Sequence, residues 1–210
     1  MSNTTLVKAG IGLCALLHQS GAEAMGKKIA TIVEKHSVGA AVAALGSAWL
    51  PGVGASAATV ACAGFIWSMY YRINAQLGIP FAKNILKSVA TAIGTNLAAY
   101  AVGSIAISSA FSFIPGLGSV GASMIMVGIS YAMTFSSGLV YLKVLARLAQ
   151  SNADFSNIGE AELKATAKDV MEHEDIKGMM KEAKSQFKEA KARGDIRKGG
   201  GEVEPLEDGE

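Results

Sequence analysis

The chain has 210 residues, of which half are hydrophobic, 7% are aromatic and 17% are charged. Its two cysteines, Cys14 and Cys62, form no C-x-x-C pair, which excludes a disulfide framework and a cysteine-based metal site. The net charge of +2 hides a split, because residues 1–150 sum to +7 and residues 151–210 sum to −5. The basic residues flank apolar runs instead of clustering on one surface, which argues against a nucleic-acid binder.

Residues 1–36 predict one or two amphipathic helices that are separated near Gly21. Lys8 precedes a short apolar run over residues 9–17, a pattern that also occurs in signal peptides. The run is short and interrupted by two glycines, so we favour an amphipathic helix over about residues 5–20, resting on a membrane or on the rest of the fold.

Residues 37–71 contain no Asp, Glu, Lys, Arg or His and predict a first hydrophobic hairpin. Its turn is Leu-Pro-Gly-Val-Gly, because Pro ends a helix and Gly permits a chain reversal. The leading arm, residues 37–50, is too short to cross a bilayer, so we expect it to extend back through Ile29. The hairpin is then either re-entrant or buried against the second one. The predicted turn residues are Pro51, Gly52 and Gly54.

Residues 88–142 form a second and longer uncharged run, with Pro115 at its midpoint. The 27 residues on each side would reach about 40 Å as a helix, compared with about 30 Å for the hydrocarbon core of a bilayer. The run therefore predicts two membrane-embedded helices joined by a turn at Pro115, Gly116 and Gly118. The similar turn 64 residues earlier indicates an internal repeat of hairpins.

Positive charge lies at the open ends of both hairpins, and none lies near the turns. The positive-inside rule therefore predicts a multi-pass membrane protein with both termini in the cytoplasm. Four crossings are expected if both hairpins span and two if only the second does. Small residues spaced four apart predict close helix packing, within a hairpin or between copies in a homo-oligomer, at Ala99, Gly103, Ala106, Ala110, Gly128 and Ala132.

Residues 151–197 are highly charged and predict two helices, over about residues 160–171 and 175–192. Asn157 is the expected cap of the first helix. The second helix is amphipathic, and its apolar face, which could meet a partner, the membrane surface or the protein's own membrane domain, contains Ile176, Met179, Met180 and Phe187. Residues 198–210 are acidic and rich in glycine, which predicts disorder.

No motif predicts catalysis or cofactor binding. Residues 116–121 match G-x-G-x-x-G but lack the acid that should follow about 20 residues later. Residues 21–28 approach a P-loop, yet Lys28 stands where a Mg²⁺-binding hydroxyl is required. Neighbouring residues 172–175 include His and acids that point in different directions on a helix. We therefore expect no enzyme activity, no cofactor and no metal.

The stretch over residues 49–148 resembles an uncharacterised bacterial membrane-domain family that accompanies Era-like small GTPases. Leu-Gly-Ile-Pro-Phe at 77–81 with Lys87 after it, Phe-Ile-Pro-Gly-Leu-Gly at 113–118 and Tyr-Leu-Lys-Val-Leu at 141–145 carry the resemblance, and residues 176–188 look similar to the charged end of such proteins. The resemblance implies a membrane module that works with a GTPase. The GTPase would act in trans, because this chain has no valid P-loop.

Together these features predict an all-α membrane protein with three parts: amphipathic helices over 1–36, a double hairpin over 37–150 and a charged helical tail over 151–197, followed by the acidic end at 198–210. The expected function is a membrane anchor or scaffold that contacts the bilayer and a GTPase. The alternative is a pore-forming or membrane-inserting effector that hides its hydrophobic hairpin inside a soluble shell.

Overall fold

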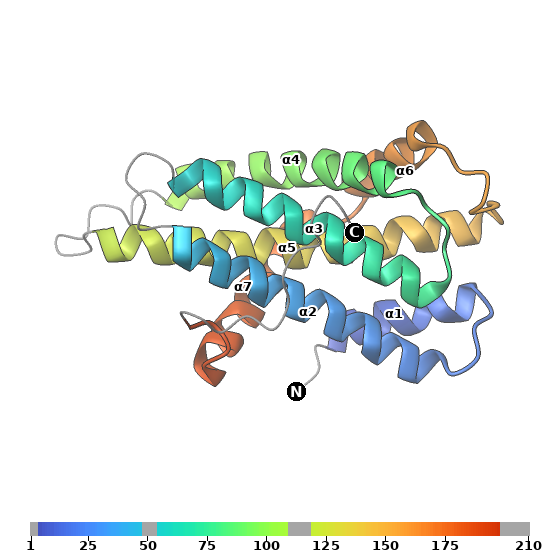
Figure 1. Ribbon diagram of the computed structural model, residues 1–210, viewed down its shortest axis with the longest axis horizontal. Coiled ribbons are helices and arrows are strands. Elements are labelled where there is room, and N and C mark those ends of the chain that lie inside the picture. Colours follow the sequence, from blue (N-terminus) through green and yellow to red (C-terminus); the bar gives the residue numbers. More distant parts are fainter. Residues whose placement is uncertain (1–3, 48–53, 109–118, 198–210) are drawn as a thin grey trace.

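The computed structural model describes residues 4–47, 54–108 and 119–197, and these ranges contain helices and turns but no strand. The prediction of an all-α fold is therefore confirmed. The helices, shown in Figure 1, are α1 (Thr4–Leu16), α2 (Ala22–Ser47), α3 (Gly54–Leu77), α4 (Lys83–Ser108), α5 (Ser119–Gln150), α6 (Glu160–His173) and α7 (Ile176–Arg193).

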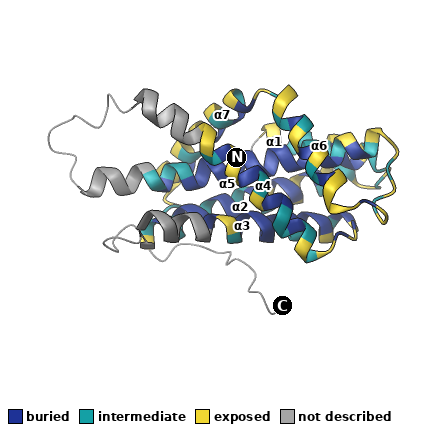
Figure 2. Ribbon diagram, turned by 90° about the horizontal axis from the view of Figure 1, so that it is seen from above, coloured by how far each residue is buried: buried dark blue, intermediate teal, exposed yellow. Residues whose placement is uncertain are grey.

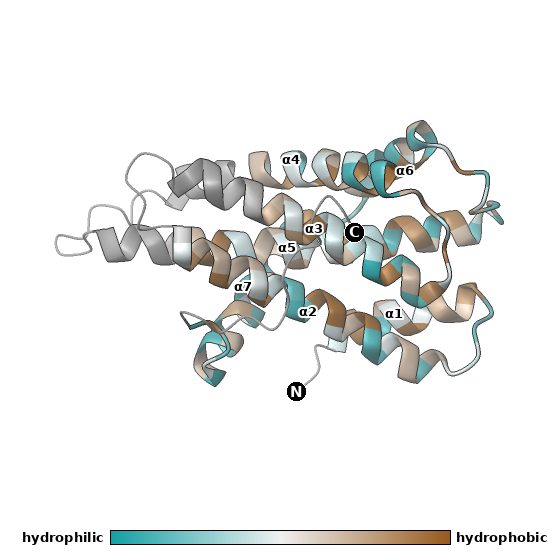
Figure 3. Cartoon of the chain, in the orientation of Figure 1, coloured by the Kyte–Doolittle hydropathy of each residue, from teal (hydrophilic) through white to brown (hydrophobic). Residues whose placement is uncertain are grey.

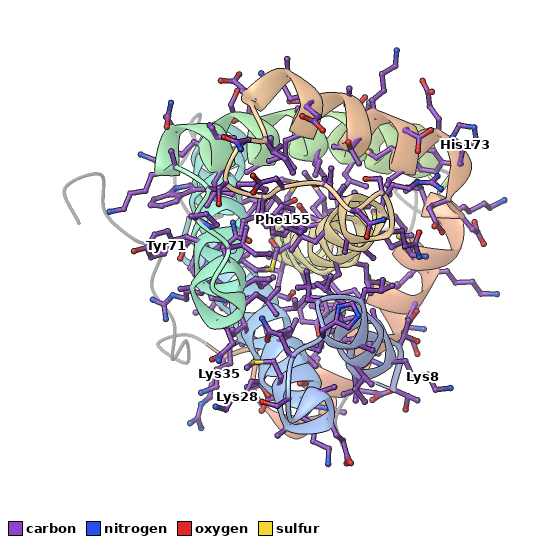
Figure 4. The ribbon with its side chains drawn as sticks, turned by 90° about the vertical axis from the view of Figure 1, so that its right-hand side faces the viewer. Lys8, Lys28, Lys35, Tyr71, Phe155 and His173 are labelled. Carbon is purple, nitrogen blue, oxygen red and sulfur yellow. The ribbon has the colours of Figure 1, made fainter. Side chains whose placement is uncertain are left out.

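Helix α5 lies in the middle of the bundle, and the other six helices contact it. The end-on view in Figure 4 shows α5 enclosed on all sides, and Figure 2 shows its buried surface. Every residue from 130 to 142 is buried. A helix that is apolar all round is expected either in a protein core or in lipid, so burial accounts for the absence of charge in this part of α5.

Helices α1 and α2 cross with their backbones in contact at two glycines. A Cβ atom on Gly10 would lie 2.9 Å from the Cα of Gly26, and a Cβ atom on Gly26 would lie 2.7 Å from the backbone nitrogen of Ile11. The turn between the helices includes Gly21, whose φ of +72° favours glycine. The predicted break near Gly21 is confirmed.

Helix α2 runs without a break through residue 36, so the predicted extension of the first arm back through Ile29 is confirmed. Helices α2 and α3 both pack on α5. The three helices meet at Gly138, where an added Cβ atom would lie 2.6 Å from Val33 Cγ1 and 3.2 Å from Met69 Sδ. The described parts of α2 and α3 thus pack against the described part of α5.

The connector between α3 and α4 also follows the sequence. Helix α3 ends at Leu77, and Gly78 then adopts a φ of +70°. The backbone N–H of Ile79 donates to the Asn74 carbonyl at 2.9 Å, which closes the helix end. Phe81 then packs against Phe155 of the α5–α6 loop, with ring centroids 5.9 Å apart, so the connector lies at the same end of the bundle as that loop.

The charged tail forms part of the bundle. Its two helices occur as predicted, but Asn157 does not cap α6: the capping position is Gly159, which makes no side-chain bond. The amide of Asn157 donates instead to the Asp154 carboxylate at 2.6 Å, because Asp154 organises the preceding turn. Asp175 caps α7 by accepting from the Gly178 N–H at 2.8 Å.

Ion pairs connect the tail to α5. Lys143 lies 2.7 Å from Glu174, and Arg147 lies 2.9 Å from Asp169. Figure 3 shows that α6, on the outside of the bundle, contains many hydrophilic residues. The expected turns and one packing position fall outside the described residues, namely Pro51, Gly52, Pro115, Gly116, Gly118 and Ala110, whereas Gly54 is the first residue of α3.

Candidate functional site

The most distinctive feature of the fold is an end at which four helices carry no Asp, Glu, Lys, Arg or His. The last part of α2, the first part of α3, the last part of α4 and the first part of α5 all lie at one end of the bundle (Figure 1). The α1–α2 turn, the α3–α4 connector and the α5–α6 loop lie at the other. We call residues 37–47, 54–71, 88–108 and 119–142 the uncharged end, since none is Asp, Glu, Lys, Arg or His.

The four helices lose their charge at nearly the same level of the bundle. The first ionisable residues outside the uncharged end are His36, Arg72, Lys87 and Lys143. His36 hydrogen-bonds Ser68 at 3.3 Å, one turn before Arg72. The ammonium of Lys87 lies 4.6 Å from the centre of the Trp67 ring. These contacts place the boundaries on α2, α3 and α4 side by side, as a single charge boundary across the bundle.

Aromatic and basic side chains pair at this charge boundary. Besides the Lys87–Trp67 contact, Lys83 Nζ lies 5.4 Å from the centre of the Tyr71 ring. Tyr71 points outward from α3 (Figure 4). Trp, Tyr and Lys are the residues that membrane proteins concentrate where the hydrocarbon core meets the headgroups. The arrangement therefore has the chemistry of a membrane interface.

Inside the uncharged end, hydroxyl and amide groups join α3 to α5. Tyr70 Oη lies 2.5 Å from Ser137 Oγ, and Tyr141 donates to Asn74 Oδ1 at 2.8 Å. The two tyrosine rings stack with centroids 3.9 Å apart. Such neutral bonds satisfy buried polar groups without introducing charge, and they hold helices together in lipid as well as in a protein core. The network fixes the register of α3 against α5.

Helix α7 lies against the uncharged part of α5 and runs in the opposite direction. Glu174 pairs with Lys143, Ser136 donates to Met180 Sδ at 3.1 Å, and the Phe187 ring would lie 3.4 Å from a Cβ atom on Gly128. The predicted partner face of α7 thus packs within the bundle, with Ile176 and Met179 buried. Sequence reasoning did not identify α5 as its contact, because a helical period does not reveal what covers the face.

The predicted packing residues have different surroundings. Gly128 makes room for the Phe187 ring of α7. Ala132 is buried, whereas Ala99 is exposed on α4. Gly103 and Ala106 lie within α4. The structure therefore brings Gly128 and Ala132 into the contact region of α5, and leaves Ala99 on the outer surface.

A groove of about 410 Å³ lies between α4 and α6. Its apolar floor includes Ile93 and Met171, and Lys164 and Lys168 line its edge. Each lysine pairs with an acid on its own helix, at 2.7 Å for Glu160 and 3.8 Å for Glu172. The positive charge along this groove is thus already compensated.

The described residues contain no group of three His, Cys, Asp or Glu side chains that could hold a metal ion. Cys14 is buried, and burial raises the pKa of its thiol, which keeps it protonated and weakly nucleophilic. His36 is buried too, with its ring nitrogens bonded to Ile32 O and Ser68 Oγ. Cys14 and His36 are therefore both held inside the bundle by packing.

Among the described residues, one stretch, Met126–Gln150 of α5, is long and apolar enough to cross a membrane. The bundle buries 83% of its apolar window, a feature that it shares with core helices of soluble proteins. No family model, curated protein or solved structure matches the chain. Function must therefore be argued from the uncharged end itself.

Proposed function

We propose that the uncharged end enters a lipid bilayer while the charged end stays in water, so that the protein is a membrane anchor or scaffold. The observation that carries this proposal is the charge boundary, which four helices share at one level and which aromatic and basic side chains accompany. A surface in contact with water can carry charged side chains at four helix ends. A surface in contact with lipid cannot, because an isolated charge in hydrocarbon costs several kcal/mol.

The position of α7 sets how deep this end can enter. With α7 docked, charged side chains flank α5 as far as Gly128, and only nine further residues, 119–127, remain in α5 beyond that level. They span about 13 Å, or roughly one leaflet of the hydrocarbon core. The docked arrangement therefore supports insertion into one leaflet. Crossing the bilayer up to Lys143 would require α7 to leave α5.

Washing of native membranes with alkaline carbonate tests the proposal. We expect the protein to stay in the membrane pellet and to enter the detergent phase on extraction. Quantitative release into the supernatant would contradict insertion, because carbonate removes proteins held only by charge or by other proteins.

A matched pair of substitutions tests which surface meets lipid. Ala99 on α4 and Ala165 on α6 are both exposed helical alanines. In water, A99D and A165D should each lower the free energy of unfolding by about the same amount, a few tenths of a kcal/mol. If insertion reaches the charge boundary, A99D should lower the carbonate-resistant fraction strongly, whereas A165D should not. Equal effects of the two variants would remove Ala99 from the lipid-facing surface.

A membrane-inserting effector is the second candidate, and one observation favours it. Helix α5 is enclosed by α1, α6 and α7, whose outer faces carry charge, and this arrangement hides an apolar hairpin arm from water. An effector of this kind would be monodisperse in buffer without detergent and would release dye from liposomes. An anchor would require detergent and would leave liposomes sealed.

The proposed scaffold role includes a GTPase as the partner in trans, an expectation that comes from the family resemblance alone. The charged end would be the surface available to it, since the uncharged end would lie in lipid. Pull-down by the full-length chain in detergent, with and without GTP, would test the partnership. Absence of any nucleotide-dependent GTPase capture would remove this part of the proposal.

A further inference from the structure

Helix α7 carries a stripe of five lysines on its outer surface. The lysines follow one another at intervals of four, three, four and three residues, which places them on one line along a helix. All five are exposed, and the stripe consists of Lys177, Lys181, Lys184, Lys188 and Lys191. The two acids within α7, Glu182 and Glu189, fall about a third of a turn away, so the stripe itself is uniformly positive.

Some other lysines on the bundle form ion pairs with acids on their own helices. Lys27 pairs with Glu23, and Lys164 pairs with Glu160, in each case one turn away on the same helix. No stripe lysine forms an ion pair with any described residue. Five uncompensated charges over about 21 Å of helix make a surface that attracts an anionic partner.

The position of the stripe indicates the kind of partner. Phe187 of α7 contacts Gly128 and Tyr131 of α5, and α7 then continues to Arg193, which pairs with Glu34 of α2 near the charge boundary. If the uncharged end enters lipid up to the level of Gly128, the part of α7 around Phe187 lies where headgroups lie. Lys184, Lys188 and Lys191 then face the headgroup region, while the apolar side of α7 remains on α5.

We propose that the lysine stripe of α7 binds the headgroups of anionic phospholipids. This inference rests on the proposed insertion of the uncharged end, and it adds a lipid preference that insertion alone does not supply. Lysines near an anionic surface contribute additively to binding, so the stripe would select anionic membranes and orient the bundle upon them.

A second anionic group is available within the chain. Residues 202–210 contain five acids, Glu202, Glu204, Glu207, Asp208 and Glu210, which match the stripe in number. Eight residues separate this segment from the end of α7, enough to fold back along the helix. The experiment must therefore distinguish the lipid from the chain's own acidic segment.

Binding of the purified full-length protein to vesicles tests the proposal, with neutral phosphatidylcholine alone or mixed with phosphatidylglycerol as the probe. K184Q/K188Q/K191Q removes three stripe lysines. K8Q/K27Q/K28Q removes the same charge from α1 and α2, where Lys8 and Lys28 project into solvent (Figure 4). All six positions are exposed, so neither variant should disturb the core.

We expect the stripe variant to bind the anionic vesicles about 100-fold more weakly, and the control variant to change by less than about fivefold. Raising the salt from 0.1 M to 0.5 M should weaken wild-type binding and leave the stripe variant nearly unchanged. Equal losses in the two variants would overturn the stripe as the lipid contact, because net charge alone would then explain binding.

The neutral vesicles separate this inference from the proposed function. If wild-type protein inserts equally well into neutral and anionic vesicles, the lipid preference is wrong and insertion stands. If it inserts into neither, the proposed function fails. If only a chain that ends at residue 201 prefers anionic vesicles, the acidic segment occupies the stripe in the intact protein, which would also overturn lipid as its partner.

Discussion

The guanidinium of Arg193 lies 2.7 Å from the carboxylate of Glu34, although 159 residues separate them in the chain. Glu34 is the last acid before the uncharged part of α2, so an unpaired carboxylate there would face a costly apolar environment. Arg193, in the last turn of α7, also bonds Asp195 at 2.8 Å. The pair fastens the end of α7 to α2, next to the charge boundary.

A double-mutant cycle should detect this pair. Both side chains are about one-third exposed, at 35% and 27%, so solvent screens the interaction. We expect a coupling of about 0.5–1 kcal/mol between E34Q and R193Q in the free energy of unfolding. Urea titration in mild detergent provides the measurement. Strict additivity of the two substitutions would show that the contact contributes nothing to stability.

Buried His36 should make the bundle sensitive to acid. Burial, aided by the nearby charge of Arg72, lowers the pKa of His36 from 6.5 to about 4. Between pH 4 and pH 6.5, His36 is therefore protonated in the unfolded chain and neutral in the folded chain. The contribution of neutral His36 to the free energy of unfolding is thus fully present above pH 6.5. It is lost as the pH falls toward 4, by up to about 3 kcal/mol.

Thermal melts between pH 4 and pH 7 would measure this dependence. H36Q keeps a polar side chain that does not titrate, so its melting temperature should vary less over the window than that of the wild type. His18 is exposed, and H18N should retain the wild-type slope. Parallel profiles for the wild type and H36Q would rule out His36 as the acid-sensitive group.

The crossing of α1 and α2 provides a test with an internal control. An alanine at Gly26 would put its Cβ atom 2.7 Å from the Ile11 nitrogen, so one backbone must move. An alanine at Gly12, in the same region of α1, would meet nothing within 4 Å. We expect G26A to destabilise by about 2 kcal/mol and G12A to stabilise by up to about 1 kcal/mol. Chemical denaturation checks both, and equal effects would mean that the helices do not approach this closely.

The hydrogen bond from Tyr141 to Asn74 should contribute more to the free energy of unfolding than its length suggests. Both residues are buried, and Asn74 Nδ2 already lacks a partner among the described residues. Y141F would leave Asn74 Oδ1 without a donor too, at a cost of about 1–3 kcal/mol. Y71F, at a half-buried tyrosine, should change stability by less than about 0.5 kcal/mol. Unfolding curves in detergent would decide, and a neutral Y141F would contradict the network.

The helical elements could be predicted from the sequence because their signals are local. Gly21 adopts a positive φ at the expected break, and the apolar period of α7 gives its bounds to within a residue. The cap of α6 was wrong for a local reason as well: Asp154 captures the Asn157 amide that was expected to reach the helix. The described residues confirm helices on both sides of each predicted turn.

The site could be predicted only in part. The absence of charge in residues 88–142 is visible in the sequence, but the enclosure of α5 by α7 is not, because it depends on contacts between residues about 60 positions apart, such as Gly128 and Phe187. Likewise, the sequence does not indicate that Arg193 pairs with Glu34. Long-range pairs of this kind leave no periodic signal in a single sequence.

The depth of a fluorescent probe tests the insertion of the uncharged end most directly. In a C14A/C62A background, single cysteines at Ser104 in α4 and Ala161 in α6 would carry the same environment-sensitive dye. In vesicles, the dye at residue 104 should be quenched by nitroxides on lipid acyl chains and shielded from iodide, and the dye at residue 161 should show the reverse. Equal iodide quenching at the two positions would mean that this end of the bundle lies in water, which would contradict the account.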